Sequence, residues 1–347
     1  EELRTRGGAS WRSTMQLLKT LGKGSKYEHR NLIGYLDGLK SFQHKELEDF
    51  YHQWYRPDYQ AIVIVGDVDV DAVENKIRTL MADIPAPAAD ASKKEPIMIP
   101  DNEEPIVNIF TDPEMQGSKI QIFVKRPALP KEVNNLVYGE MLDVVQAYIA
   151  TMENARLQEI AMQPDAPFLG AGMGTGDVIG IIPTLDATLF VAMTEDGKLA
   201  RGFETLYTEM EKVRRYGFTQ GEFERAQDNL MRQAERQYAN RNDRTNGEYV
   251  QTYLDNFQKN EAMPDAETEW KLDSMLLKLV NVDAVNAFAQ QTIYPRNQVI
   301  FITAPEKEGI VNPTVEEILA IREKVAGSEI AAYELSLIHI SEPTRLD

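Results

Sequence analysis

Two stretches of the chain share one pattern of apolar and polar positions, a helical stripe followed by a strand. In the first, Leu47, Phe50, Tyr51 and Trp54 stand at positions i, i+3, i+4 and i+7, which is one apolar face of an amphipathic helix. A proline shortly afterwards stops this helix, because its ring clashes with the preceding turn and it lacks an N–H. The run Ala61–Val65 that follows is rich in β-branched residues, which predicts a buried strand.

The same pattern returns near the C-terminal end of the chain. The segment "LEDFYHQWYRPDYQAIVIVG" at 47–66 aligns without a gap with "VNAFAQQTIYPRNQVIFITA" at 285–304, and six of the twenty positions are identical. The alignment favours a duplicated helix–turn–strand unit over two unrelated units of the same kind. The helix face is repeated by Val285, Phe288, Ala289 and Thr292. After the first unit, Asp71 and Glu74 predict a capping box that opens another helix.

A linker separates the two units. Residues 85–105, "PAPAADASKKEPIMIPDNEEP", are rich in Pro, Ala, Asp and Lys, so a second domain is expected to open near residue 106. If both domains follow one plan, the first would begin more than a hundred residues before residue 1. The sequence therefore predicts the C-terminal remainder of a first domain over 1–84, a linker over 85–105 and a second domain over 106–334.

The second domain has the element order of an α+β fold. Alternation in "IVNIFTD" and "KIQIFVKR" predicts strands, residues 130–162 predict a helix, and residues 177–194 predict two more strands. Helices are then expected up to Gly217 and from a capping box at Thr219 and Glu222, before a returning strand at 298–303. This order favours a mostly antiparallel sheet with helices packed on one side.

The glycine-rich segment "GAGMGTG" at 170–176 does not have the form of a phosphate loop. It contains neither G-x-G-x-x-G nor a Walker lysine, and it precedes a predicted strand instead of a helix. We therefore interpret its glycines as bends or close backbone contacts and expect no nucleotide.

Composition excludes several kinds of function. The net charge of −18 argues against nucleic acid as a partner, since phosphate binding needs a basic face. No apolar run has the length of a membrane span. The absence of cysteine excludes disulfides, thiolate metal sites and cysteine nucleophiles.

The sequence contains no complete active site. His29, His44 and His52 belong to no H-x-x-E-H motif, and the last two lie off the apolar stripe of their helix, so we expect them to be exposed. No serine stands in G-x-S-x-G. The last thirteen residues, "LSLIHISEPTRLD" at 335–347, resemble the translation of a sequencing adapter, and we interpret them as an artefact tail.

One family shares several of these motifs. The segment "FYHQWYRPDYQAIVIVGDVDVDAVENKI" at 50–77 resembles the end of the first domain in pitrilysin-type zinc metallopeptidases, the inverted zincins, which include insulin-degrading enzyme and the mitochondrial processing peptidase. Tyr59 stands where that motif usually has Asn. The segments "GSKYEHRNLIG" at 24–34 and "GFTQGEFERAQDNL" at 217–230 resemble further motifs of the family. The overall sequence pattern resembles that of its large bacterial members most.

The resemblance implies duplicated metallopeptidase-type domains around one Zn2+ site. In the family, two histidines of H-x-x-E-H and a later glutamate hold zinc, and the glutamate of the motif activates the zinc-bound water. The opening Glu1-Glu2-Leu3-Arg4 is similar to the helix of the third ligand, so Glu2 is the candidate ligand and Glu1 the second choice. The alternative is two solvated glutamates on a helix face. The resemblance implies no catalytic residue within the chain.

Three hypotheses follow for function. The first is a fragment of a zinc-dependent metalloendopeptidase that cleaves peptides, inactive alone and a poor zinc binder because it lacks H-x-x-E-H. The second is a non-catalytic half or subunit of the same architecture that serves substrate binding or assembly. The third is an unrelated α+β binding protein. The resemblance implies a peptide substrate and a complementary half as partners, and bacterial relatives suggest a periplasmic or other extracytoplasmic location by analogy.

Overall fold

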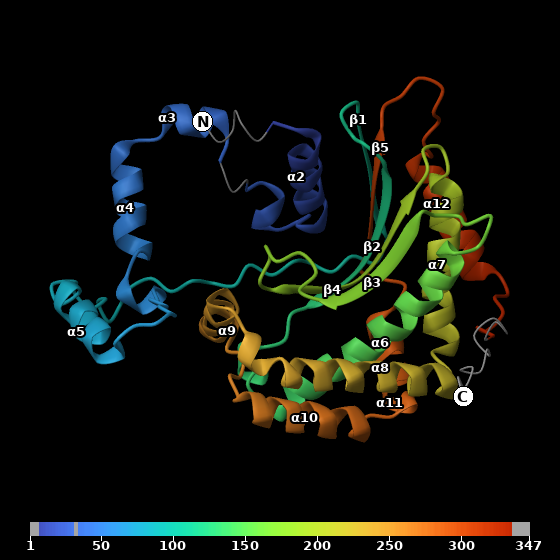
Figure 1. Ribbon diagram of the computed structural model, residues 1–347. Coiled ribbons are helices and arrows are strands. Elements are labelled where there is room, and N and C mark those ends of the chain that lie inside the picture. The colour runs from blue at the N-terminus through green and yellow to red at the C-terminus, as the bar shows by residue number, and fades with distance from the viewer. Residues whose placement is uncertain (1–6, 31–33, 335–347) are drawn as a thin grey trace.

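The central sheet takes all its strands from residues after 105. The computed structural model describes residues 7–30 and 34–334. Its strands form one sheet in the order β1-β5-β2-β4-β3 (Figure 1). β1 pairs with β5 in parallel and every other pair is antiparallel, which confirms the mostly antiparallel sheet. The strands are β1 Ile106–Asp112, β2 Ser118–Pro127, β3 Gly170–Gly176, β4 Leu185–Thr194 and β5 Gln298–Pro305.

Helices that follow β2 in the sequence form a layer on one face of this sheet (Figure 1). On the opposite face lies α2, Ala9–Leu21, which packs through Leu21 against Phe123 and Phe301. The main helical layer therefore has the predicted one-sided arrangement, and α2 adds a helix behind the sheet. The remaining helices of this body are α6 Val137–Ala161, α7 Leu199–Tyr216, α8 Gln220–Ala239, α9 Asn246–Lys259, α10 Ala266–Leu279, α11 Val282–Thr292 and α12 Val315–Gly327, with short 3-10 turns η1 Lys26–Glu28, η3 Lys131–Val133 and η4 Arg241–Asp243.

The two sides of the sheet follow from the alternation of strand residues. In β5, Ile300 and Ile302 belong to the large core under the helical layer, whereas Val299 and Phe301 face the α2 side. Successive side chains of a strand point to opposite faces, so a strand covered on both faces is apolar at most positions. β5 accordingly is buried along its whole length.

Residues 35–84 form a separate feature, which we call the arm. Its helices are α3 Leu36–Ser41, α4 His44–Trp54 and α5 Val70–Leu80, with the 3-10 turn η2 Pro57–Tyr59 between the last two. None of the three α-helices contains a buried residue, and Figure 1 shows them standing apart from the sheet.

The prediction of a buried strand at Ala61–Val65 is wrong for this structure. These residues are in neither helix nor strand, and the side chains of Ile62 and Ile64 are 53% and 50% exposed. A strand needs a neighbour for its backbone hydrogen bonds and a layer to cover its apolar side chains. Every strand of the described residues belongs to the sheet that begins at β1, so the segment has neither.

The two repeated units therefore differ in their surroundings and agree in their helix. α4 and α11 each have 11 residues and occupy equivalent positions of the internal alignment. In α11 the side chains of Val285 and Ala289 are fully buried, whereas Leu47 of α4 is 60% exposed. The helix forms in both places because its hydrogen bonds are local, and the strand forms only where other strands adjoin it.

Three local predictions need correction and two are confirmed. Residues 170–176 are themselves the edge strand β3, and the predicted strand at 177–184 is a region of turns and bends. The cap of α5 is Asp69 instead of Asp71, because Asp69 has the extended backbone from which its carboxylate accepts the N–H of Ala72. The capping box that opens α8 and the glycine that ends α7, with a φ of 65°, are as predicted.

Candidate functional site

The predicted zinc ligands and histidines do not form a site in the described residues. Glu2 and Glu1 both lie outside the described residues, as does the predicted artefact tail at 335–347. His29, His44 and His52 are exposed, and the exposure predicted for the last two is confirmed. Within residues 7–30 and 34–334, no three His, Asp or Glu side chains converge to hold a metal ion. Zinc therefore does not fit the described residues.

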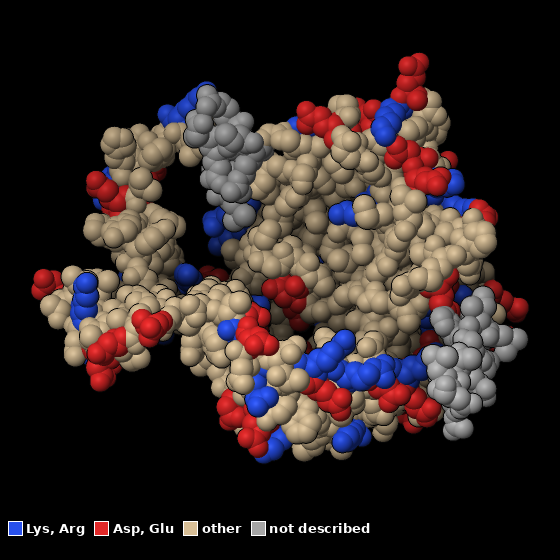
Figure 2. All heavy atoms as spheres, viewed as in Figure 1, with Lys and Arg blue, Asp and Glu red and all other residues tan. Residues whose placement is uncertain are grey.

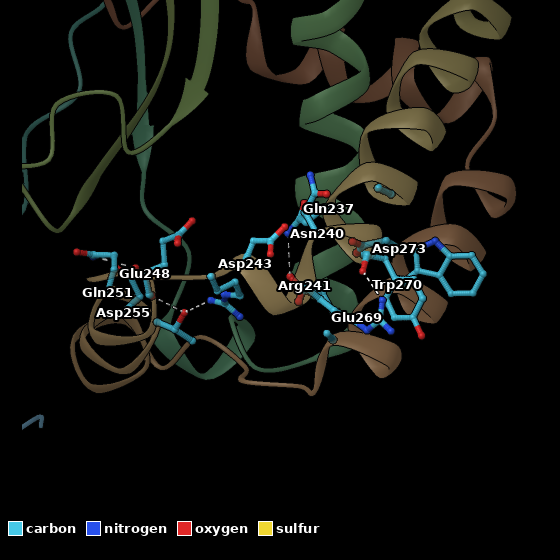
Figure 3. Close-up of a pocket in the computed structure, with 15 residues that line it drawn as sticks. Gln237, Asn240, Arg241, Asp243, Glu248, Gln251, Asp255, Glu269, Trp270 and Asp273 are labelled. Carbon is cyan, nitrogen blue, oxygen red and sulfur yellow. Dashed lines mark hydrogen bonds between the residues drawn. The ribbon is translucent and has the colours of Figure 1, made fainter. Parts of the chain in front are cut away.

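A hollow of about 490 Å³ lies at the far end of the helical layer (Figure 3). The chain turns there because α8 ends at Ala239, η4 reverses its direction, and Thr245 opens α9 with a capping box. α10 closes the hollow from the other side, with Asp265 as its cap. The lining side chains come from α8, η4, α9 and α10, and they include Tyr238, Arg241, Asp243, Arg244, Glu248, Asp255, Glu269, Trp270 and Asp273.

Aromatic stacking fixes one wall of the hollow. The rings of Tyr238 and Trp270 lie 5.1 Å apart at 24°, so α8 and α10 are joined by an offset stack. The guanidinium of Arg241 lies 4.3 Å from the ring centre of Tyr238, and its Nη1 donates to the backbone carbonyl oxygen of Tyr238. This arginine is therefore held against the wall.

Carboxylates dominate the charge of the hollow. Burial raises the pKa of Glu269, the nearby Asp273 raises it further, and Arg244 acts in the opposite direction. Burial also raises the pKa of Asp273. Gln237 Nε2 donates to Glu269 Oε1 at 3.3 Å (Figure 3). A positively charged group in the hollow would relieve this repulsion between carboxylates.

Charges of both signs cover the surface over α8, α9 and α10, whereas much of the arm is uncharged (Figure 2). The arm exposes large apolar side chains instead, among them Phe50, Tyr51, Ile62 and Val70. Each of these four side chains is more than 50% exposed, and exposed apolar surface of this kind can be covered by further polypeptide. The described chain therefore offers a carboxylate-rich hollow and an arm with exposed apolar side chains as candidate binding surfaces.

Comparison with known proteins finds sequence similarity to one group of peptidases. Residues 41–167 match the family described as the peptidase M16 inactive domain. The chain is 23% identical over 226 residues to the probable zinc protease PqqL of Escherichia coli (strain K12), an alignment that covers 65% of this chain and 23% of that protein. It is 25% identical over 298 residues to a zinc protease PQQL-like of Arabidopsis thaliana, with 84% of this chain and 27% of that protein covered.

A solved structure agrees with these alignments. The crystal structure of the first half of the periplasmic protease PqqL from Escherichia coli superposes with a TM-score of 0.82 at 18% identity, covering 96% of this chain and 70% of that one. The chain is homologous to PqqL-like zinc proteases, and its residues 41–167 to their peptidase M16 inactive domain. The resemblance to the pitrilysin-type family is confirmed, and the match to an inactive domain is consistent with the predicted fragment that lacks the H-x-x-E-H motif. The chain spans about a quarter of the length of these two curated relatives.

The region that matches the M16 inactive domain includes part of the arm and part of the sheet with its covering helices. Residues 41–167 contain α4, α5, the segment from 85 to 105, β1, β2 and α6. No helix of the described residues is both long and apolar enough to cross a bilayer. The hollow between α8 and α10 was not predicted from the sequence, because its lining residues are spread from Ala234 to Asp273 without a motif.

Proposed function

We propose that the chain is part of a peptidase M16 zinc metalloendopeptidase and that residues 106–334 are its non-catalytic half. The observation that carries the proposal is the match to the M16 inactive domain in a sequence without H-x-x-E-H. In this role the half binds and encloses a peptide while the groups that activate water lie elsewhere. The chain alone is then expected to cleave nothing and to hold zinc poorly.

The arm is proposed to belong to the other half. Its helix α4 repeats α11, and its Ala61–Val65 segment repeats part of β5. We therefore assign residues 1–84 to the rear of the zinc-carrying domain, residues 85–105 to the linker, and residues 335–347 to an artefact tail. The apolar side chains of the arm would pack against the strands and helices that complete that domain.

Partners and location follow from the same assignment. The partners are a peptide substrate and the complementary half of the peptidase chamber, and the cofactor of the intact protein is Zn2+. Because the similar PqqL of Escherichia coli is a periplasmic protease, we propose an extracytoplasmic location for the intact protein.

The test is to isolate the genomic DNA on both sides of this reading frame and express the longer protein. An H-x-x-E-H helix upstream, zinc bound at one equivalent and zinc-dependent cleavage of a quenched peptide would support the proposal. In that protein, Glu2→Gln is expected to lose zinc, whereas Glu1→Gln serves as the matched control and keeps it. An upstream sequence without H-x-x-E-H would favour the non-catalytic subunit, and cleavage by the 347-residue chain alone would contradict the proposal.

A further inference from the structure

A group of charged side chains is enclosed where α6 packs against α7 and α8. Glu153 and Arg156 of α6 are 0% and 2% exposed, Glu209 of α7 is 3% exposed, and Glu222 of α8 is 5% exposed. Charged groups are rarely buried to this extent unless each is paired. Glu222 is paired with Arg156 and Glu209 with Lys212, each at 2.6 Å, so Glu153 is the carboxyl group of this set to which no described basic side chain is hydrogen-bonded.

Arg156 joins three parts of the fold. Its Nε and Nη2 donate to the two oxygens of Glu222 at 2.6 and 2.9 Å, and Nη2 also donates to the carbonyl oxygen of Gly217 at 3.0 Å. Its guanidinium lies 4.7 Å from the ring centre of Phe218 and 4.3 Å from that of Tyr333. Arg156 thus connects α6 to the start of α8 and to the segment that follows α12.

Glu222 serves two purposes at once. Its Oε2 accepts the backbone N–H of Thr219 at 2.8 Å and the hydroxyl of the same residue at 2.9 Å, which completes the capping box of α8. Displacing Arg156 from Glu222 would therefore disturb the first turn of α8 as well as the ion pair.

Glu153 lies beside this network without being hydrogen-bonded to it. Neither of its carboxyl oxygens has a hydrogen-bond partner in the described residues, and neither does Arg156 Nη1 or Glu209 Oε2. Burial raises the pKa of Glu153 to about 8, the charges of Glu209 and Glu222 raise it further, and Arg156 and Lys212 oppose the shift. At neutral pH the group is therefore mainly an uncharged acid.

We propose that Glu153 is a proton-operated switch on the packing of α6 against α8 and the segment 328–334. As an acid it leaves the guanidinium of Arg156 on Glu222. When its proton leaves to solvent, the carboxylate accepts from Arg156 Nη1 and draws the guanidinium away from Glu222. The start of α8 and the contact with Tyr333 then loosen together.

The direction of the effect follows from the raised pKa. A group whose pKa is higher in the folded than in the unfolded state gives stability that is complete below the unfolded value of 4.5 and is lost as pH rises through about 8. The switch is therefore closed at pH 6.5 and open at pH 9. Charged groups face Glu153 from its own helix (Arg156), from α7 (Glu209 and Lys212) and from α8 (Glu222).

Hydrogen exchange followed by mass spectrometry tests this on the full chain. Wild type and Glu153→Gln are compared at the same pH, so that the intrinsic exchange rate is common to both. At pH 6.5 the two should agree. At pH 9, where the carboxylate would outnumber the acid by about ten to one, peptides from 214–224 and 328–334 should exchange about tenfold faster in the wild type. Glu224→Gln on the exposed face of α8 should behave like the wild type.

Several outcomes would overturn the proposal. The proposal is contradicted if wild type and Glu153→Gln exchange equally at pH 9, or if they differ by the same amount at both pH values. It is also contradicted if every segment, including β2, exchanges faster in the wild type at pH 9. If Glu153→Gln does not fold, Glu153→Met takes its place. The wild type alone also decides: protection of 214–224 that stays constant from pH 6.5 to 9, after correction for the intrinsic rate, contradicts the switch.

Discussion

The internal repeat provides a matched pair of substitutions in one chain. Ile300 and Ile62 stand at equivalent positions of two segments that align without a gap. Ile300 lies in β5, is 0% exposed, and pairs with Val107 on one side and Ile122 on the other. Ile62 is 53% exposed in a segment without strand neighbours among the described residues. Ile300→Ala and Ile62→Ala therefore make the same chemical change in opposite environments.

The losses in the free energy of unfolding caused by these two substitutions should differ by several kcal/mol. Replacing isoleucine by alanine removes three carbons, and burial contributes about 0.8 kcal/mol per carbon, so the transfer contribution at Ile300 is about 2.4 kcal/mol. The cavity left in a core that does not collapse raises the total to about 3–4 kcal/mol. At Ile62 most of the side chain already faces water, so the free energy of unfolding should change by less than about 0.5 kcal/mol.

Urea unfolding followed by far-UV circular dichroism measures both values. With a slope of about 3 kcal/mol per molar, Ile300→Ala should move the midpoint down by about 1 M, whereas Ile62→Ala should leave it within about 0.2 M. The slope should stay constant in both variants. A cost at Ile62 equal to that at Ile300 would show that the 61–65 segment is buried, and a cost at Ile300 below about 1 kcal/mol would refute the assignment of β5 to the core.

Two further predictions concern the edges of the sheet. The side-chain amide of Asn154 donates to the carbonyl oxygen of Met173 at 3.0 Å and accepts its N–H at 2.7 Å, so it covers the outer edge of β3. Asn154→Ala should lower the free energy of unfolding in urea by about 1–3 kcal/mol, because the N–H and C=O of Met173 lose their partners. It should also increase light scattering, because the strand edge is then open to other chains. The hydrogen-bonded guanidinium of Arg12 holds the pKa of Asp112 below its ordinary value. The contact of α2 with β1 is therefore complete above about pH 4 and is lost as pH falls through the lowered pKa. In Arg12→Gln, hydrogen exchange of the α2 amides should increase at a higher pH than in the wild type.

Each of these has a clear contrary result. Unchanged stability and solubility of Asn154→Ala would mean that β3 needs no cover at its edge. Lys19→Gln, an exposed change on α2, is the control for the acid experiment. If it shifts the exchange of α2 as much as Arg12→Gln does, the ion pair with Asp112 is not what holds the helix.

Local signals in the sequence predicted most of the helices and their ends. The capping box at Thr219 and Glu222 and the stop at Gly217 depend only on residues within one turn, so they can be recognised without knowledge of the fold. The alternation in the segments of β1 and β2 was equally visible. β3 was missed because most of its residues are glycine, and its strand geometry comes from pairing with β4 and from Asn154, which is distant in sequence.

The candidate sites could not be predicted from the sequence in the same way. Tyr238 and Trp270 belong to helices that η4 and α9 separate along the chain, and no motif indicates that α8 and α10 would stack them. The same is true of the buried cluster: Glu222 was recognised as a capping residue, but its ion pair with Arg156 needs the packing of α6 on α8. Tertiary contacts of this kind leave no periodic trace in the sequence.

The arm shows most directly how local and non-local forces separate, and it leads to a last prediction. α4 forms without burying any residue because a capping box at Gln43 and Glu46 and the hydrogen bonds of its own backbone suffice, whereas Ala61–Val65 needs neighbouring strands that the described residues do not supply. If the arm belongs to a second sheet completed by other polypeptide, Ile62 will become the equivalent of Ile300 in the longer protein. Ile62→Ala should then cost about 3–4 kcal/mol there, in place of less than about 0.5 kcal/mol in the present chain. The same urea titration on both proteins measures the change, with Ile300→Ala as the internal reference. A cost at Ile62 that stays small in the longer protein would separate the arm from any sheet and contradict the duplication.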